Sequence, residues 1–161
     1  MIFVVLGTHE LPFDRLLKEI EQQIINGNIT EEVLVQAGHT KFRSEYIKFI
    51  DFTTYEEMER NYHIASFIIT HGGTGSITMG VKMGKKVIAV PRLVKYDEHN
   101  DDHQLEIVKQ FYESGHILYW NEPDSLGEVL GRLDSFEPVP YSSGKSEILT
   151  IIKEFIEREV R

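Results

Sequence analysis

The 161-residue sequence contains no cysteine. This absence excludes disulfide bonds and thiolate metal sites, and it fits a reducing compartment. Basic side chains are also scarce, because 17 lysines and arginines stand against 26 aspartates and glutamates, for a formal net charge of −9. An acidic chain without a basic run argues against nucleic acid as a partner and gives no reason to expect direct binding to anionic lipid.

Long hydrophobic runs are missing as well. No apolar stretch approaches the roughly 20 residues that a transmembrane helix needs, and residues 1–10 lack the basic start of a signal peptide. A chain of this length suits one domain with a substantial core of its own. We therefore expect a cytoplasmic protein whose attachment to any membrane is supplied by another molecule.

Short apolar runs alternate with helical patterns along the chain. The run over residues 2–6 is continuous, which is typical of a strand buried on both faces. We predict further strands over residues 32–36, 46–52, 67–70, 87–90 and 116–120. Helices are predicted over residues 12–25, 74–83, 103–114 and 145–161, with two more that begin at a Thr53 or Thr54 cap and at Pro123.

This alternation predicts an α/β fold with a Rossmann-like parallel sheet and helices on both faces. We expect one Rossmann-like, ligand-binding domain over residues 1–137, followed by a linker and a C-terminal helix over residues 138–161. The apolar stripe of that last helix packs either on the domain or on a partner. Ligands of such sheets bind beyond the carboxyl ends of the strands, so the loops that follow the strands are the candidate site.

A glycine-rich loop lies between a predicted strand and a predicted helix, in the stretch IITHGGTGSITMG of residues 68–80. Its glycines permit close approach of the backbone, and the helix start offers unpaired N–H groups and a positive dipole end, which together suit a diphosphate. A packing turn is the alternative. The motif is neither a dinucleotide fingerprint nor a P-loop. The predicted diphosphate residues are His71, Gly72, Gly73, Thr74, Gly75 and Ser76.

A second stretch, PRLVKYDEHNDDHQ of residues 91–104, crowds carboxylates and imidazoles together. A metal site is one interpretation, but the spacing matches neither a helical histidine pair nor an EF-hand loop. A solvated acidic loop is a second interpretation. A sugar-binding loop is the third, because carboxylate, imidazole and amide groups can bind several hydroxyls at once.

These two stretches, with the opening VVLGTHELPFDRLL of residues 4–17, resemble the donor-binding half of GT-B glycosyltransferases, the glycosyltransferase family 28 C-terminal domain. The resemblance covers about residues 1–135. Within this group the chain most resembles the soluble subunits of two-part transferases. These are the bacterial capsule or exopolysaccharide subunits and the eukaryotic subunit that transfers GlcNAc in N-glycan assembly. The bacterial branch resembles the chain more, through the segment 98–104 and the start Gly7-Thr8-His9-Glu10.

The resemblance implies a catalytic, donor-binding subunit that transfers a hexose from a UDP-sugar to a lipid-linked acceptor in capsule or exopolysaccharide biosynthesis. It also implies a separate membrane-associated subunit that binds the acceptor and recruits this chain to the inner face of the membrane. The UDP-sugar is a substrate, and the resemblance implies no cofactor and no metal. The positions that it marks are Glu98, His103 and Gln104 for the sugar, Gly7 and Thr8 in the first loop, and Gly38, His39 and Met58 for the nucleoside.

A general base is also needed near the acceptor. His9 has a suitable ordinary pKa and follows the first predicted strand. A hydrogen bond that orders its loop is the favoured alternative to catalysis, and a base on the partner is the third interpretation. Met79 departs from the family pattern, in which some members have an acidic residue that faces the ribose. Two alternatives to a transferase stay open: a non-catalytic UDP-sugar-binding enhancer subunit and a UDP-sugar epimerase or hydrolase.

Overall fold

The computed structural model describes residues 1–142, and these residues form a parallel sheet between two layers of helices. The strand order is β3-β2-β1-β4-β5-β6, and every neighbouring pair is parallel. The chain passes from β1 outward to β3 and then returns to place β4 on the other side of β1, so the direction of winding changes between β1 and β4. The strands are β1 (Ile2–Val5), β2 (Val33–Gln36), β3 (Ile47–Ile50), β4 (Ile68–His71), β5 (Val87–Val90) and β6 (Leu118–Tyr119).

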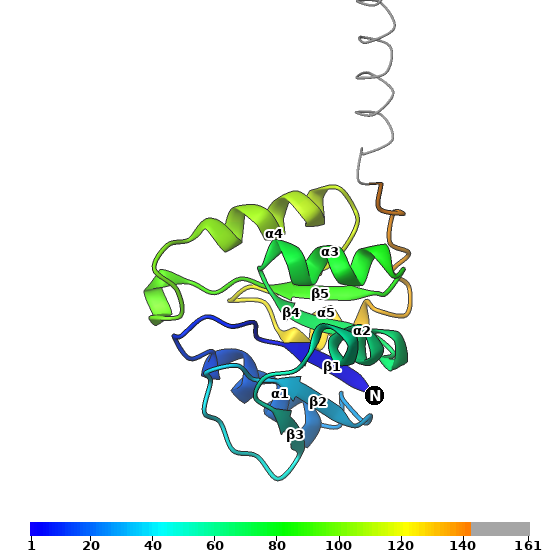
Figure 1. The fold of residues 1–161 in the computed structure, drawn as a ribbon. Helices are drawn as coiled ribbons and strands as arrows, with labels where there is room; N and C mark the ends of the chain where they lie inside the picture. Colours follow the sequence, from blue (N-terminus) through cyan, green and yellow to red (C-terminus); the bar gives the residue numbers. More distant parts are fainter. Residues whose placement is uncertain (143–161) are drawn as a thin grey trace, which may run out of the picture.

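Helices cover both faces of the sheet (Figure 1). Helices α1 and α5 contribute to the core cluster on one face, and α2, α3 and α4 to the cluster on the other. This arrangement confirms the predicted α/β fold with its Rossmann-like parallel sheet. The helices are α1 (Asp14–Ile25), α2 (Tyr55–Ile64), α3 (Thr74–Lys82), α4 (His103–Glu113) and α5 (Leu126–Gly131), with a short 3-10 helix η1 (Val94–Tyr96).

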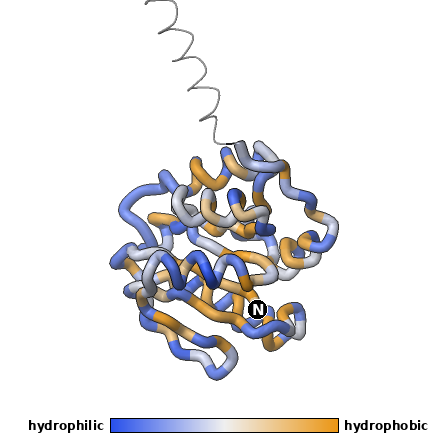
Figure 2. The backbone as a smooth tube through the Cα atoms, turned by 45° about the vertical axis from the view of Figure 1, so that its right-hand side comes forward, coloured by the Kyte–Doolittle hydropathy of each residue, from blue (hydrophilic) through white to orange (hydrophobic). Residues whose placement is uncertain are grey.

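Strand β1 lies at the centre and shows why the apolar runs form this sheet. Ile2 and Val4 point into the cluster beneath α1, whereas Phe3 and Val5 point into the cluster beneath α3, and all four are buried. Burying each such side chain contributes about 1.5–3 kcal/mol. The hydrophobic segments accordingly cross the middle of the molecule in Figure 2, while hydrophilic loops lie at its rim.

The ends of several elements differ from the prediction. Strand β3 is shorter than residues 46–52, because only Ile47–Ile50 pair with β2. The last described helix does not begin at Pro123, which follows a cis peptide bond, but at Leu126. There the hydroxyl of Ser125 caps the helix by accepting from the N–H of Gly127 at 3.1 Å. The predicted helix over residues 145–161 lies outside the described residues.

Candidate functional site

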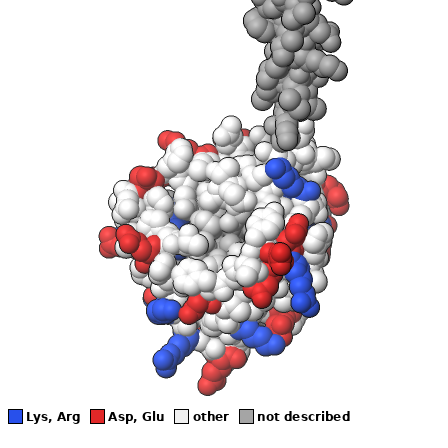
Figure 3. Space-filling model, in the orientation of Figure 1, with Lys and Arg blue, Asp and Glu red and all other residues white. Residues whose placement is uncertain are grey.

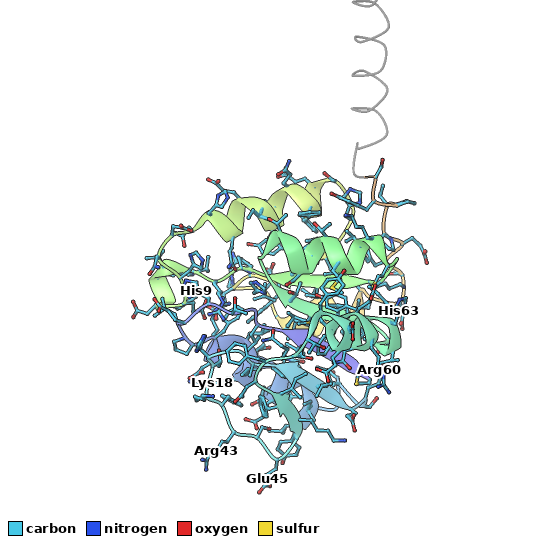
Figure 4. The ribbon with its side chains drawn as sticks, viewed as in Figure 1. His9, Lys18, Arg43, Glu45, Arg60 and His63 are labelled. Carbon is cyan, nitrogen blue, oxygen red and sulfur yellow. The ribbon has the colours of Figure 1, made fainter. Side chains whose placement is uncertain are left out.

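The loops that follow the strands meet at the carboxyl edge of the sheet, which is the left-hand edge in Figure 1. The winding direction changes at this edge, between β1 and β4. Figure 4 shows His9 at this edge, on the loop after β1, and His63 at the opposite end, where α2 ends. A cavity of about 330 Å³ opens between the loops. Its walls come from the ends of β1, β2 and β4, from the start of α2 and from the first turn of α3: Val5, Gly7, Thr8, Gln36, Phe52, Thr53, Met58, His71, Gly73, Gly75 and Ser76.

Helix α3 presents its amino terminus to this cavity. Gly73 is the N-cap in an extended conformation, and no side chain caps the first turn. A Cβ added to Gly75 would meet nothing within 4 Å, so the space in front of the helix start is open. The Tyr62 hydroxyl holds the same turn from behind by donating to the Ser76 carbonyl at 3.0 Å. Uncapped N–H groups and a helix dipole facing an open cavity make an anion site.

The ring of His71 lies between the loop after β1 and the glycine loop. A Cβ on Gly7, whose φ is +77°, would lie 2.7 Å from the ring, and one on Gly73 would lie 2.3 Å from its Nε2 atom. Its Nδ1 atom lies 3.2 Å from the carbonyl oxygen of Val5, which can only accept, so Nδ1 carries the proton. Burial lowers the pKa of His71 to about 4. At neutral pH the ring is therefore uncharged, with a free lone pair on Nε2.

Two residues of the glycine loop do not face the cavity. The N–H of Gly72 donates to Oε1 of Gln104 at 3.0 Å, and a Cβ on Gly72 would lie 2.7 Å from the Cβ of Gln104. Gly72 therefore packs against α4, and its N–H group is not free for a diphosphate. The side chain of Thr74 is exposed and lines a separate hollow beside Ile107. Of the six predicted diphosphate residues, His71, Gly73, Gly75 and Ser76 line the cavity and Gly72 and Thr74 do not; the assignment of the loop to a diphosphate stays a prediction.

The family follows from comparison with known proteins. Residues 1–158 match the glycosyltransferase family 28 C-terminal domain. The chain belongs to this family. It is 26% identical over 160 residues to the UDP-N-acetylglucosamine transferase subunit ALG13 of Yarrowia lipolytica, across 87% of this chain and 77% of that protein. It is 28% identical over 103 residues to ALG13 of Candida albicans, across 64% of this chain but only 32% of that protein.

Solved structures agree on the fold of this family 28 domain. An NMR structure of ALG13 superposes with a TM-score of 0.55 at 19% identity, and the match covers 90% of this chain and 91% of that one. MurG of Acinetobacter baumannii superposes with a TM-score of 0.55 at 18% identity, with 82% of this chain and 40% of that one. The chain is thus a glycosyltransferase domain with the architecture of a GT-B half.

Glu98, expected to bind the sugar in this family 28 domain, is instead buried and engaged. It is 3% exposed. Its carboxylate accepts from Nε and Nη2 of Arg15, both at 2.9 Å, and from the N–H of Leu93 at 3.1 Å. The expectation is corrected, because a carboxylate that fixes its own loop to α1 is not presented to a ligand.

The neighbouring His103 and Gln104 begin α4. Oε1 of Gln104 accepts from the N–H groups of Gly72 and Arg92, at 3.0 and 3.1 Å. This orients the amide so that its Nε2 group, which makes no hydrogen bond within residues 1–142, keeps two donors for another group. The side chain of His103 is 69% exposed, and its Nδ1 lies 3.3 Å from Glu106. His103 is therefore open to a ligand, whereas Gln104 is only 8% exposed, and neither side chain lines the 330 Å³ cavity.

His9 makes the loop-ordering hydrogen bond that was the alternative to catalysis. Its Nδ1 accepts from the N–H of Leu11 at 3.2 Å, so the proton of the neutral ring sits on Nε2. The ring lies against that of His99, with 4.4 Å between their centres. Burial first, and then the charge of His99, lower the pKa of His9. In this arrangement neither ring nitrogen offers a free lone pair, which argues against His9 as the general base.

The three residues predicted to bind the nucleoside lie in different surroundings. Met58 lines the cavity, whereas Gly38 lies behind its wall, since a Cβ there would come within 2.2 Å of the Gly7 carbonyl oxygen. His39 is exposed and meets the ring of Phe52 edge-on at 5.1 Å. Phe52, which the sequence analysis did not single out, is 56% exposed at the cavity mouth. An aromatic residue at the end of a predicted strand was the only signal for it.

Gln36 is a second residue that sequence reasoning missed. Its side-chain amide accepts from the N–H of Gly7 and donates to the Gly7 carbonyl, both at 3.1 Å, and so fixes the first loop against β2. The polar end of an otherwise apolar strand was its signal. Within residues 1–142 no cluster of three or more His, Asp or Glu residues could hold a metal ion, and no helix is both long and apolar enough to span a bilayer.

A larger hollow of about 640 Å³ lies at the same edge, on the α1 side. Four carboxylates line it against two cations, and one of these cations, Arg15, is already paired with Glu98. The charged residues of its wall are Asp14, Arg15, Lys18, Glu19, Glu98 and Glu122. It lacks a glycine loop, and its acidic walls suit a diphosphate poorly. The smaller cavity in front of α3 is therefore the candidate donor site.

Proposed function

We propose that this chain is the catalytic, donor-binding subunit of a UDP-sugar-dependent glycosyltransferase that adds a hexose to a lipid-linked acceptor. In this proposal it works in capsule or exopolysaccharide biosynthesis, in the cytoplasm, with a membrane-associated subunit that binds the acceptor. The observation that carries the proposal is the uncapped amino terminus of α3, open at Gly75 and facing the cavity.

The diphosphate is assigned to the first turn of α3. The N–H groups at Gly75 and Ser76 point out of an uncapped helix start, and the Ser76 hydroxyl adds a further donor. In glycosyl transfer, negative charge grows on the departing diphosphate as the bond to C1 of the sugar breaks. Fixed donors and a helix dipole stabilise this charge where it develops, which can replace a metal ion in that task. We therefore expect no requirement for metal or cofactor.

The nucleoside is assigned to the wall formed by Phe52, Thr53 and Met58. The exposed ring of Phe52 offers a stacking surface for uracil, and Met58 offers an adaptable apolar contact. Met79 packs into the core cluster beneath α3. Since its thioether cannot replace a carboxylate, the ribose hydroxyls must find other partners.

The sugar is assigned to the start of α4. The Nε2 donors of Gln104 are directed by its two backbone contacts, and His103 stands beside it on the surface. Polar contacts of this kind discriminate strongly between hydroxyl and amide substituents. The ALG13 relatives are UDP-N-acetylglucosamine transferase subunits by name, so UDP-GlcNAc is the first donor to test.

A partner is assigned to complete the active site. The chain matches 40% of MurG, and its relatives are named as subunits. Because His9 has no free lone pair, we place the general base on the acceptor-binding subunit and give His9 the role of an Nε2–H donor. The same observation favours the second candidate, a non-catalytic UDP-sugar-binding subunit. Family membership favours transfer over the epimerase or hydrolase alternative.

The test is calorimetric titration of the full chain with UDP and a panel of UDP-sugars in the presence of EDTA. The proposal expects binding without metal and a preference among the sugars. A transfer assay with the co-expressed membrane subunit then separates the two candidates. Turnover that needs this chain supports the transferase, and tight donor binding without turnover supports the non-catalytic subunit. Absence of UDP binding by both the chain and the complex would refute both.

A further inference from the structure

The proposed diphosphate site has little cationic side-chain surface. Among residues 1–142, no lysine or arginine lines the cavity in front of α3. The net charge of the whole chain is −9, and in Figure 3 lysines and arginines lie toward the margins of the face in view, around a pale centre. A bound diphosphate would therefore meet a helix dipole within an acidic protein. One cation nevertheless lies directly behind the cavity, the guanidinium of Arg92.

Arg92 follows β5 and is fully buried, with 0% of its surface exposed. Its guanidinium donates to the carbonyl oxygens of Leu6 at 2.9 Å, Leu11 at 2.8 Å and Glu98 at 3.2 Å. The ring of Phe13 faces it at 4.6 Å. All these partners are uncharged, so they solvate the cation without neutralising it.

The nearest carboxylate is already paired. Glu98 forms a bidentate ion pair with Arg15 of α1. The buried Arg92 and the partly buried Arg15 thus share one buried anion, and the cluster of Arg15, Glu98 and Arg92 carries a surplus of one positive charge. Burial lowers the pKa of Arg92 only to about 10, so the surplus charge persists at neutral pH.

This surplus charge is close to the cavity wall. Leu6, whose carbonyl oxygen binds the guanidinium, is followed directly by Gly7, which lines the cavity. The N–H of Arg92 shares Oε1 of Gln104 with the N–H of Gly72, so Arg92 is also tied to the glycine loop. Burial first, and then the charge of Arg92, lower the pKa of His71, in line with the proximity of Arg92 to this wall.

We propose that Arg92 is a buried counter-charge that stabilises the UDP diphosphate through space without touching it. The proposal rests on the proposed donor site. A structural link between loops does not require a cation, and burying an unpaired cation is costly. An anion on the far side of the loop offsets that cost, because Coulomb attraction through a low-dielectric wall is stronger than in water. Arg92 thus acts as a positioning and electrostatic residue for the donor.

The experiment measures how affinity rises with ligand charge. The full chain, with its partner subunit if that is needed for binding, is titrated with uridine, UMP and UDP. Arg92→Met should weaken UDP by about tenfold or more, UMP by less, and uridine by less than about threefold. Arg92→Lys keeps the charge and should keep most of the gradient. The matched control is Arg132→Met, which removes an exposed arginine at the end of α5 and should change none of the three affinities.

A second variant, which is expected to raise rather than lower the affinity for UDP, tests the proposal if Arg92→Met does not fold. Glu98→Gln preserves the shape and acceptor oxygen of the side chain but raises the surplus charge by one. It should increase the affinity for UDP relative to uridine several-fold. Circular dichroism and thermal unfolding check that each variant is folded.

Two outcomes would overturn the proposal on its own. Equal losses of uridine, UMP and UDP affinity in Arg92→Met would mean that Arg92 only holds the loops together. An unchanged ratio of UDP to uridine affinity in Glu98→Gln would mean that the buried charge does not reach the ligand. If the wild-type chain and its complex bind none of the three ligands, the donor site itself is refuted, and the role of Arg92 with it.

Discussion

Replacing Gly75 by aspartate places a negative charge at the cavity wall without a steric cost. Gly75 lies in the first turn of α3, and an added Cβ there would meet nothing within 4 Å. Gly73 is a poorer choice, since its Cβ would clash with His71. An acidic side chain near a helix amino terminus contributes about 0.3–1 kcal/mol, and aspartate has a better helix propensity than glycine. Gly75→Asp should therefore leave the unfolding free energy unchanged or raise it.

The expected loss of affinity follows from Coulomb repulsion. At a separation of about 6 Å, two unit charges repel by about 0.7 kcal/mol at the dielectric constant of water and by about 3 kcal/mol at an effective value of 20. The diphosphate carries about two negative charges, so even the weaker value costs about 1.4 kcal/mol, or tenfold in affinity. The aspartate carboxylate can also accept from the N–H groups that the phosphate would use, which adds to the loss.

The assay is calorimetric titration with UDP, at low and at high salt, beside a thermal unfolding curve. Gly131→Asp is the matched control, because Gly131 also has open space around it but lies at the end of α5. Gly75→Ala separates the effect of bulk from that of charge. Part of the loss in Gly75→Asp should be screened as the salt rises. Wild-type affinity for UDP in folded Gly75→Asp would refute the placement of the diphosphate at α3.

Three further predictions concern the buried polar groups. The pKa of His71 is about 4 in the folded chain and 6.5 ordinarily, so the unfolded chain binds the proton first as the pH falls. The free energy of unfolding should therefore be highest above pH 6.5 and fall by about 1.4 kcal/mol per pH unit toward pH 4. Urea unfolding of His71→Asn should show a smaller fall. Gln104→Glu keeps an acceptor for Gly72 but loses the amide donors, so it should weaken the UDP-sugar more than UDP, whereas Gln104→Leu should weaken both in calorimetry. Glu98→Ala leaves Arg15 buried without its anion and should destabilise the fold by about 3–5 kcal/mol in urea unfolding, with no change in the ratio of UDP-sugar to UDP affinity.

The strands were predictable because each is a short run of buried apolar residues. Strand β5 has the predicted bounds, and β1 is one residue shorter than predicted. Thr54 caps α2 through a capping box with Glu57, a pattern that is also local. The start of α5 was missed because Pro123 suits both a first helical position and a turn, while the competing cap at Ser125 follows two residues later.

The roles of polar residues were harder to predict because they depend on partners far along the chain. Glu98 stands in an acidic stretch that predicts exposure, yet Arg15, 83 residues earlier, takes it into a buried ion pair. Gln104 was assigned to the sugar, but its oxygen joins two backbone groups that no local pattern connects to it. The division into residues 1–137 and 138–161 stays a prediction, since the described residues end at 142.

The glycines of the site show why a motif alone does not identify the ligand contacts. Added side chains would collide at three of them: with His71 at Gly7 and Gly73, and with Gln104 at Gly72. These three are glycines because the loops pack against one another, whereas the open space at Gly75 faces the cavity. The same packing fixes the loops before any ligand arrives. A donor that binds to such a site loses little affinity to ordering the protein, so Gly7→Ala, through strain and the clash with His71, should weaken UDP binding even though it adds no charge.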